Sequence, residues 1–193
     1  MGDDLRSALR PAVVLTILFA ILTGIVYPLA MTGVAQLVFP AKADGSLLRD
    51  GDRVIGSTVL GQAFTSPRYF NTRPSAAGKG YDALASAGSN LGPASKALVE
   101  RVTTDLAARR AEGVAGPVPA DLVTTSGSGL DPDLSPAAAL AQVPRVARVR
   151  GLPEAEVRAL VGRHVERPTL GFLGEPRVNA LALNRALDRL GAR

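Results

Sequence analysis

The feature that most constrains this chain is an uncharged stretch near its start, because no Asp, Glu, Lys or Arg occurs from Pro11 to Ala41. A helix that crosses the ~30 Å hydrocarbon core of a bilayer needs about 20 mostly apolar residues, and Val13 to Phe39 exceeds that length. The apolar core of a cleaved signal peptide has only about 7–15 residues. We therefore predict a retained transmembrane helix over residues 11–40, preceded by an N-terminal tail of residues 1–10.

Two details of this stretch concern how the helix packs. Pro28 removes one backbone hydrogen bond, so we expect a kink there. Thr16, Ala20 and Gly24 recur at i, i+4 and i+8 and form a stripe of small residues, of the kind that lets helices approach closely in lipid. The same spacing also arises by chance in a chain rich in Ala and Gly, so both interpretations of the stripe stay open.

The charges that flank the stretch leave its orientation open. Arg6 and Arg10 precede it, and Lys42, Arg49 and Arg53 follow it. The positive-inside rule compares Lys and Arg near the two ends, and long domains are translocated largely regardless of charge. The residues alone therefore allow the main domain on either side of a membrane.

The rest of the chain, residues 41–193, alternates short helical patterns with Gly- and Pro-rich loops, which predicts an α+β fold: one small mixed domain behind the membrane helix. The expected elements are a hairpin with its turn at 49–52, a helix over 95–110, a β-prone run at 122–125, one kinked or two short helices over 136–150, a helix from Pro153, and a last helix over about 181–190. The long Gly/Pro-rich stretch 61–94 is predicted to form an interaction surface, since such loops usually carry function.

The residue inventory excludes several kinds of chemistry. The chain has no Cys, a single His and no phosphate-binding loop motif, which argues against thiol catalysis, a multi-His metal centre and a phosphate loop. Asp131 and Asp133 could hold a hard cation, but carboxylates beside Pro132 are more typical of a helix entry. We expect no catalytic residue and no metal site, and we expect His164 to be a satisfied or surface histidine.

Nucleic-acid binding is also not expected, although the net charge is +5. A nucleic-acid surface needs clustered cations interleaved with aromatic side chains. The chain has five Phe, three Tyr and no Trp, and its Arg residues are spread along the sequence. The basic balance therefore does not indicate such a partner.

Four loop stretches have an unusual composition of Gly, Ser, Asn and Pro, namely residues 69–76, 86–93, 125–132 and 171–179. Backbone N–H groups in such loops can cradle an anion, and Ser89 and Asn90 could then donate to a phosphate or a ribose. The same residues also build tight turns. From composition alone, both interpretations stay open.

A set of short motifs, which follow one another in a fixed order, covers essentially the whole chain. Its members are Gly56-Ser57 with Leu60-Gly61-Gln62, Tyr69-Phe70-x-x-Arg73-Pro74-Ser75-Ala76, Ser86-Ala87-Gly88-Ser89-Asn90-Leu91, Leu122-Val123-Thr124 with Ser126-Gly127-Ser128-Gly129-Leu130-Asp131, Gln142-Val143-Pro144-Arg145-Val146-Ala147, and Val178-Asn179 with Leu183-Asn184-x-Ala186-Leu187-Asp188. In this order, behind one N-terminal span, the chain resembles the KdpC family, the small subunit of the Kdp potassium-transporting P-type ATPase.

The resemblance implies a single-pass protein of the bacterial inner membrane with an extracytoplasmic domain. It implies two partners, a channel-like subunit that selects and handles potassium and a subunit that hydrolyses ATP through an aspartyl-phosphate. It also implies a catalytic chaperone that raises ATP affinity, with no cofactor of its own and with Ser86, Gly88, Ser89 and Asn90 as nucleotide-binding residues. Ala87 departs from the family's Ser-Gly-Gly-Ser-Asn pattern.

We expect a non-catalytic subunit that assembles or stabilises the two partners. A domain outside the membrane cannot touch ATP held inside, so any effect on ATP affinity would be a coupling between separate sites. Aromatic and Arg residues are the usual anchors of interfaces, which makes Tyr69, Phe70 and Arg73, with Asn90, the interface candidates. The alternatives are a membrane-anchored hydrolase that uses Ser126 or Ser128 and a membrane-anchored ligand-binding module without a pump.

Overall fold

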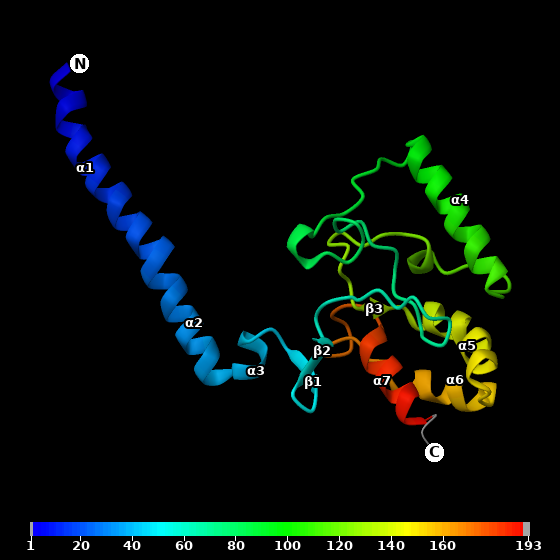
Figure 1. Ribbon diagram of the computed structural model, residues 1–193. Helices are drawn as coiled ribbons and strands as arrows, with labels where there is room; N and C mark the ends of the chain where they lie inside the picture. Colours follow the sequence, from blue (N-terminus) through cyan, green and yellow to red (C-terminus); the bar gives the residue numbers. More distant parts are fainter. Residues whose placement is uncertain (1, 191–193) are drawn as a thin grey trace. The chain divides into compact units, whose positions relative to one another are not determined.

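A computed structural model describes residues 2–190 of the chain. The chain divides into two compact units, and the boundary falls between Leu47 and Leu48. The first unit contains helix α1 (Gly2–Ile21), a five-residue π-helical segment (Leu22–Val26), helix α2 (Tyr27–Val38) and the short helix α3 (Pro40–Ala43) (Figure 1). The predicted membrane helix is therefore present as α1, the π-helical segment and α2 in direct succession.

The π-helical segment lies directly before Pro28. The backbone N–H of Tyr27 donates to the carbonyl of Leu22, five residues back, and Pro28 has no N–H to continue the normal ladder. The hydroxyl of Thr23 donates to the carbonyl of Phe19 at 2.7 Å and satisfies that acceptor inside the helix. The expected effect of Pro28 thus takes the form of a π-helical turn, which is one of the recognised ways in which helices accommodate proline.

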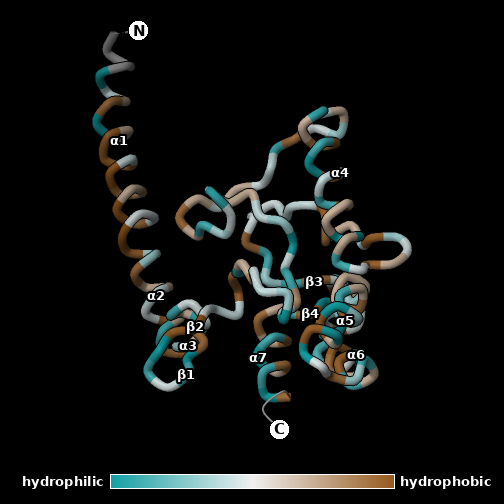
Figure 2. Tube along the Cα trace, turned by 45° about the vertical axis from the view of Figure 1, so that its right-hand side comes forward, coloured by the Kyte–Doolittle hydropathy of each residue, from teal (hydrophilic) through white to brown (hydrophobic). Residues whose placement is uncertain are grey.

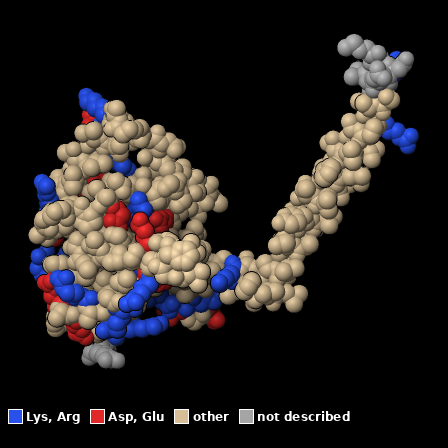
Figure 3. Space-filling model, turned by 180° about the vertical axis from the view of Figure 1, so that it is seen from behind, with Lys and Arg blue, Asp and Glu red and all other residues tan. Residues whose placement is uncertain are grey.

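The long helix has an apolar surface throughout. Within residues 2–190, Arg6–Val38 is the one stretch of helix that is long and apolar enough to cross a membrane. Its large apolar side chains are exposed, for example Leu18 and Phe19, and hydrophobic residues occur along most of its length (Figure 2). Figure 3 shows charged side chains only near its two ends. An exposed apolar surface of this extent requires lipid or another protein to cover it.

The second unit begins with the predicted hairpin. Strand β1 (Leu47–Asp50) pairs with strand β2 (Arg53–Ser57). The two residues between the strands form the turn, where Gly51 has a φ of +57°, a conformation that glycine adopts without steric cost. The hairpin and the position of its turn are confirmed.

Three helices form the core of the second unit. They are α5 (Pro136–Arg150), α6 (Glu154–Arg163) and α7 (Ala180–Leu190). Ser135 caps α5 by accepting from the backbone N–H of Ala138 at 3.0 Å, and α5 continues through Pro144, which is exposed. Their apolar faces enclose one buried cluster of Phe70, Ala139, Val143, Val146, Ala147, Val157, Leu160, Val161, Val178, Leu183 and Leu187. The stretch 136–150 is therefore one helix.

The second sheet was not predicted. Strands β3 (Asp133–Leu134) and β4 (Val178–Asn179) pair antiparallel, with Leu134 opposite Val178. The predicted strand at 122–125 is wrong, because residues Ala120–Leu122 form a 3-10 helix. The hydroxyl of Thr124 donates to the carbonyl of Ala120 at 2.7 Å, a local side-chain bond that competes with strand pairing.

The remaining helix, α4 (Lys96–Ala111), follows the long loop. It matches the helix predicted over 95–110, with Ser95 at the N-cap position but without a side-chain capping bond. None of its described residues is buried, although the predicted stripe of Leu98, Val102 and Leu106 is half-buried. The α+β fold class is confirmed, and the stretch 61–94 contains one short 3-10 helix (Ala83–Ala85) among irregular loops.

Candidate functional site

Residues Tyr69–Asn71, called here the clamped segment, are held by two amide side chains. The N–H of Phe70 donates to Oδ1 of Asn184 at 2.8 Å, and Nδ2 of Asn184 donates to the carbonyl of Phe70 at 2.9 Å. Gln142 bonds the backbone of Asn71 in the same two-sided way, at 2.8 and 3.0 Å. Side chains from α7 and α5 thus replace the neighbouring strands that an extended segment would otherwise need.

Arg145 anchors the segment from a buried position. Its side chain is 5% exposed and donates to the carbonyls of Pro67 at 2.6 Å and Tyr69 at 3.1 Å, and to Oδ1 of Asn71 at 2.6 Å. Burial lowers the pKa of Arg145, and the nearby carboxylate of Glu112, 3.5 Å from its Nε, opposes that shift. A buried guanidinium is stable only with such partners.

The side chain of Tyr69 is fixed by a charged pair. The guanidinium of Arg150 lies 4.9 Å from the centre of the Tyr69 ring and forms an ion pair with Asp188 at 2.7 Å. The Tyr69 hydroxyl donates to the same carboxylate at 3.2 Å. Tyr69 is half-buried, so part of it still faces outward as the interface prediction requires.

Phe70 has a different place from the one expected. Its side chain is 0% exposed and belongs to the buried cluster of the three helices. A fully buried ring offers no surface to a partner, so in this fold Phe70 contributes packing energy and its role as an interface anchor must be corrected. Sequence reasoning did not assign Gln142, Arg145 and Asn184 to this segment, although all three lie within matched motifs.

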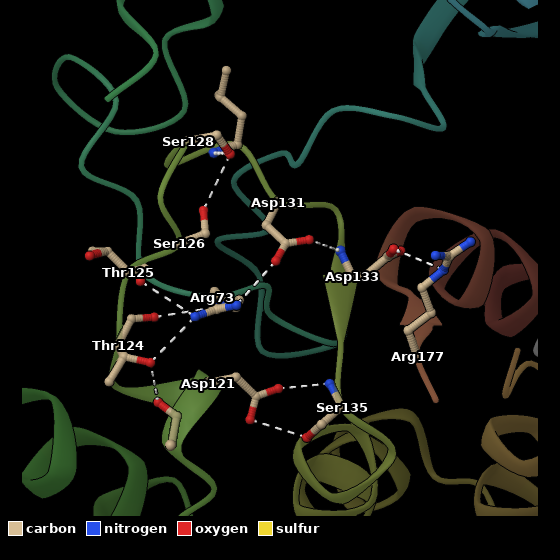
Figure 4. A network of polar contacts seen from close by, with 12 residues as sticks. Arg73, Asp121, Thr124, Thr125, Ser126, Ser128, Asp131, Asp133, Ser135 and Arg177 are labelled. Carbon is tan, nitrogen blue, oxygen red and sulfur yellow. Dashed lines mark hydrogen bonds and ion pairs between the residues drawn. The ribbon is translucent and has the colours of Figure 1, made fainter. Parts of the chain in front are cut away.

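A second group of contacts joins three loops, Arg73–Ala77, Ser86–Asn90 and Thr124–Asp131, called here the loop cluster. Arg73 forms an ion pair with Asp131 at 3.1 Å and reaches the carbonyls of Thr124 and Thr125 at 3.5 and 3.4 Å (Figure 4). The Arg73 side chain is 26% exposed. Arg73 therefore uses most of its N–H donors for bonds within the domain, while part of its side chain stays exposed to solvent.

The serines of the loop cluster also bond to the chain itself. The hydroxyl of Ser75 donates to the carbonyl of Gly129 at 2.6 Å. The carbonyl of Ser128 accepts from the Ser86 hydroxyl and from the N–H of Ala87, both at 3.0 Å. These bonds hold two loops side by side that lie about forty residues apart in the sequence.

Two glycines let these backbones approach closely. A Cβ on Gly88 would lie 3.1 Å from the carbonyl oxygen of Gly127. A Cβ on Gly129 would lie 2.6 Å from both the nitrogen of Ala77 and the carbonyl oxygen of Ala87, and Gly129 has a φ of +68°. Larger residues at these positions would push the loops apart.

Ser126 and Ser128 are not arranged as nucleophiles. Their hydroxyls accept from the N–H groups of Gly129 and Leu130 at 2.9 and 3.1 Å, which stabilises the turn that contains them. Nδ1 of His164 lies 2.9 Å from the carbonyl of Leu160 in its own helix turn. Within the described residues, no hydrogen bond joins His164 to either serine, so the contacts give the hydrolase alternative no support.

The four residues assigned to nucleotide by resemblance divide into two pairs. Ser86 and Gly88 face the 126–129 loop through the contacts described above. For Ser89 and Asn90, the described part of the chain provides no side-chain hydrogen-bond partner, and Asn90 is exposed with a φ of +51°. Asn90 is thus an interface and nucleotide candidate that is exposed and whose side chain is not bonded within the described residues.

The carboxylates near the loop cluster are paired. Asp121, Asp131 and Asp133 line a hollow of about 440 Å³ together with Arg73 and Arg177. Asp131 bonds Arg73 and the N–H of Asp133, and Asp133 lies 3.2 Å from Arg177. Burial raises the pKa of Asp133, while the hydrogen bond from Asn179 and the charge of Arg177 lower it. Among the described residues, no three His, Cys, Asp or Glu side chains are arranged so that they could hold a metal ion together.

The small-residue stripe on the long helix is open. Thr16, Ala20 and Gly24 are exposed, and apart from the neighbouring backbone of its own helix nothing lies within 4 Å of where a Cβ on Gly24 would be. The hydroxyl of Thr16 donates to the carbonyl of Ala12 at 2.8 Å. The stripe therefore offers a smooth surface for a neighbouring helix, and its hydroxyl is already satisfied within its own helix.

Comparison with known proteins places these features in a family context. Residues 9–189 match the family model described as "KdpC: K+-transporting ATPase, c chain". A protein of Caulobacter vibrioides named potassium-transporting ATPase KdpC subunit is 61% identical over 183 residues, which cover 94% of this chain and 93% of the relative. Proteins of the same name from Methylorubrum extorquens and Allorhizobium ampelinum are 56% and 55% identical, with 97% and 96% of this chain and 99% and 98% of the relatives covered.

Proposed function

This chain belongs to the KdpC family, the c chain of K+-transporting ATPases, and from that premise we propose that it acts by contact as a non-catalytic subunit of the pump. In this proposal it assembles or stabilises two partners, a channel-like subunit that selects potassium and a subunit that hydrolyses ATP. The relatives are named as subunits of a potassium-transporting ATPase, which supports a place in a membrane complex.

One observation carries the proposal: the polar side chains of the matched motifs bond mainly to the chain itself. Arg73, Ser75, Gln142, Arg145 and Asn184 all pair with backbone groups of the same domain. A catalytic site needs a nucleophile or a base that is free to meet substrate. Motifs whose polar groups hold loops in place are better suited to presenting a rigid surface to partner subunits.

The effect on ATP affinity is proposed to be indirect. In the proposed topology the domain lies outside the bacterial inner membrane, and ATP is held on the other side. A change in ATP affinity then requires that the domain contacts two states of the pump with different strength. The pairing of Ser86 and Ala87 with Ser128 supports this route, because those groups of the nucleotide candidate loop are already occupied.

Co-purification from membranes distinguishes the pump-subunit proposal from its alternatives. With an affinity tag on this chain and mild detergent, we expect the two larger subunits to elute in a fixed ratio to it. The variant G24L places a bulky side chain on the open small-residue stripe and should lower recovery of the complex. G33L is the control, because Gly33 is equally open but lies outside the Thr16, Ala20 and Gly24 stripe. Recovery of the tagged chain alone would contradict the proposal.

Cysteine labelling tests the proposed topology, and the chain has no native Cys. Leu84 is 99% exposed in the domain, and Ser7 lies at the other end of the long helix. In intact cells we expect a membrane-impermeant maleimide to label L84C and to leave S7C unlabelled until the membrane is opened. The reverse pattern would place the domain inside and would make direct contact with ATP feasible.

A further inference from the structure

The loop stretch 171–179 ends in residues whose contacts are described above, namely Arg177, Val178 and Asn179, but it begins in an unusual apolar turn. Residues 168–174, called here the apolar tip, contain no charged side chain. Leu170, Phe172 and Leu173 are 79%, 74% and 52% exposed. Exposed apolar residues that occur singly need no explanation, but three within four residues indicate a contact site.

The apolar tip is an ordered turn. The backbones of Thr169 and Leu173 exchange two hydrogen bonds at 3.0 and 2.9 Å. Glu166 and Arg177 exchange two more at 2.8 and 3.0 Å, and their side chains form an ion pair at 3.0 Å. The three apolar side chains are therefore held outward by a fixed backbone, which reduces the entropy lost when they bind.

The turn also breaks a local conformational rule. Leu170 has a φ of +56°, a left-handed conformation that is common for Gly and Asn and unfavourable for a bulky side chain. Asn would fit both the backbone and the solvent at this exposed position. Residues that break two local preferences at once are expected at functional sites.

Within the second unit, the base of the apolar tip lies near the hairpin with which that unit begins. Because β1 and β2 form a hairpin, the start of β1 lies beside the end of β2, and Thr58 and Val59 follow directly. Thr58 and Val59 line a hollow of about 490 Å³ together with Glu166 and Arg177, at the base of the apolar tip. Val59 is itself 57% exposed and extends the apolar surface.

The length of the tether sets how far this side can move from a bilayer. Leu48 follows Val38, the last residue of α2, by ten residues. A fully extended chain spans at most about 3.3–3.6 Å per residue, or about 35 Å here. A domain held this close to a membrane meets the bilayer surface at a high effective concentration, so a small apolar contact is sufficient for binding.

We propose that the apolar tip is a second membrane contact, in which Leu170, Phe172 and Leu173 insert into the interface between headgroups and acyl chains. Arg167 adjoins the tip, and within residues 2–190 it forms no ion pair, so it is available to an anionic lipid phosphate. Such contacts reach about 5–10 Å into the boundary between headgroups and acyl chains. The inference needs the long helix to lie in a membrane and is independent of the side on which the domain lies.

Fluorescence of single introduced tryptophans tests this contact, since the chain has no Trp. The full-length F172W variant is reconstituted into phosphatidylcholine vesicles with phosphatidylglycerol, with or without lipids brominated near the headgroup end of the acyl chains. We expect blue-shifted emission from F172W and about twofold or greater quenching by the brominated lipid, which is consistent with interfacial depth. L84W, at a 99% exposed position, is the control and should emit as in water and stay unquenched. Equal behaviour of the two variants would overturn the proposal.

Two further measurements complete the test. The first asks whether lipid or a partner subunit covers the apolar tip, and the second asks whether Leu170 serves membrane contact or folding. If F172W is shielded from aqueous iodide only in the assembled pump, and brominated lipid never quenches it, a partner subunit covers the apolar tip and the proposal is wrong. The L170N change should relax the turn, so it should maintain or raise the thermal midpoint while it lowers lipid quenching in the F172W background. If L170N lowers both the thermal midpoint and the lipid quenching, Leu170 serves folding, which contradicts its proposed role in membrane contact.

Discussion

The clamped segment and the loop cluster are almost adjacent in the sequence, yet they are stabilised in different ways. Phe70 is fully buried, and the segment around it is bonded by Gln142 and Asn184 from two helices. Arg73, three residues later, is part-exposed and holds loops together. The difference shows that a run of motif residues can contain both core and surface, so motif membership alone does not indicate which residues meet a partner.

The largest effect is expected for F70A in the clamped segment. Removal of a buried Phe side chain costs the transfer energy and leaves a cavity, typically about 3–5 kcal/mol. Urea unfolding of the full-length protein in detergent measures the free energy of unfolding, with L84A at the 99% exposed position as control. The control should change it by less than ~0.5 kcal/mol. A loss below ~1 kcal/mol for F70A would contradict the buried placement.

The next effect is expected for N184A. The change leaves both the N–H and the carbonyl of Phe70 without the partners they have at 2.8 and 2.9 Å. Each buried group left unsatisfied costs at least about 1 kcal/mol, so a total loss of at least about 2 kcal/mol is expected. N90A, at an exposed amide, is the matched control, and in the same unfolding experiment it should lose less, namely only the cost of an Ala at φ +51°. If the two variants lose equal stability, the clamp does not carry the energy assigned to it.

A glycine pair tests whether the loop cluster is as tightly fitted as its contacts indicate. Gly129 and Gly151 have nearly equal φ values of +68° and +67°, but a Cβ would meet backbone atoms at 2.6 Å only at Gly129. G151A should lose about 1–2 kcal/mol for the left-handed conformation, and G129A should lose that amount plus the cost of separating the loops. If G129A and G151A lose equal free energy of unfolding, the loops separate at no cost, and the loop cluster is not as tightly fitted as its contacts indicate.

The smallest effect is expected from pH. Burial raises the pKa of Asp133 above its ordinary value of 3.8, so the folded state binds a proton more tightly than the unfolded state. The stability that this carboxyl contributes is complete below pH 3.8 and is lost as the pH rises through the raised pKa. The free energy of unfolding of the wild type should therefore fall relative to D133N as the pH rises from 3 to 6. If the stability of the wild type relative to D133N rises with pH instead, Arg177 and Asn179 outweigh burial and lower the pKa of Asp133.

Sequence reasoning located most elements whose signals are local. The uncharged stretch predicted the long helix, the Gly51 turn predicted the hairpin, and Ser135 with Pro136 predicted the start of α5. It missed the two-residue strands β3 and β4, because pairs this short have no periodic pattern. It also assigned a strand to Leu122–Thr125, where a Thr124 hydroxyl bond to the backbone favours a helical turn.

For the candidate site, the sequence by itself determined which residue types are present and which chemistry they exclude. The length of the apolar stretch and the absence of Cys do not depend on the fold. Only the tertiary structure decided that Phe70 faces inward and Asn90 outward, and that Gln142 and Asn184 bond to the segment between Tyr69 and Asn71. The physical reason is that burial and long-range hydrogen bonds join residues 71 to 114 positions apart, and no local pattern encodes which partner will satisfy a buried backbone group.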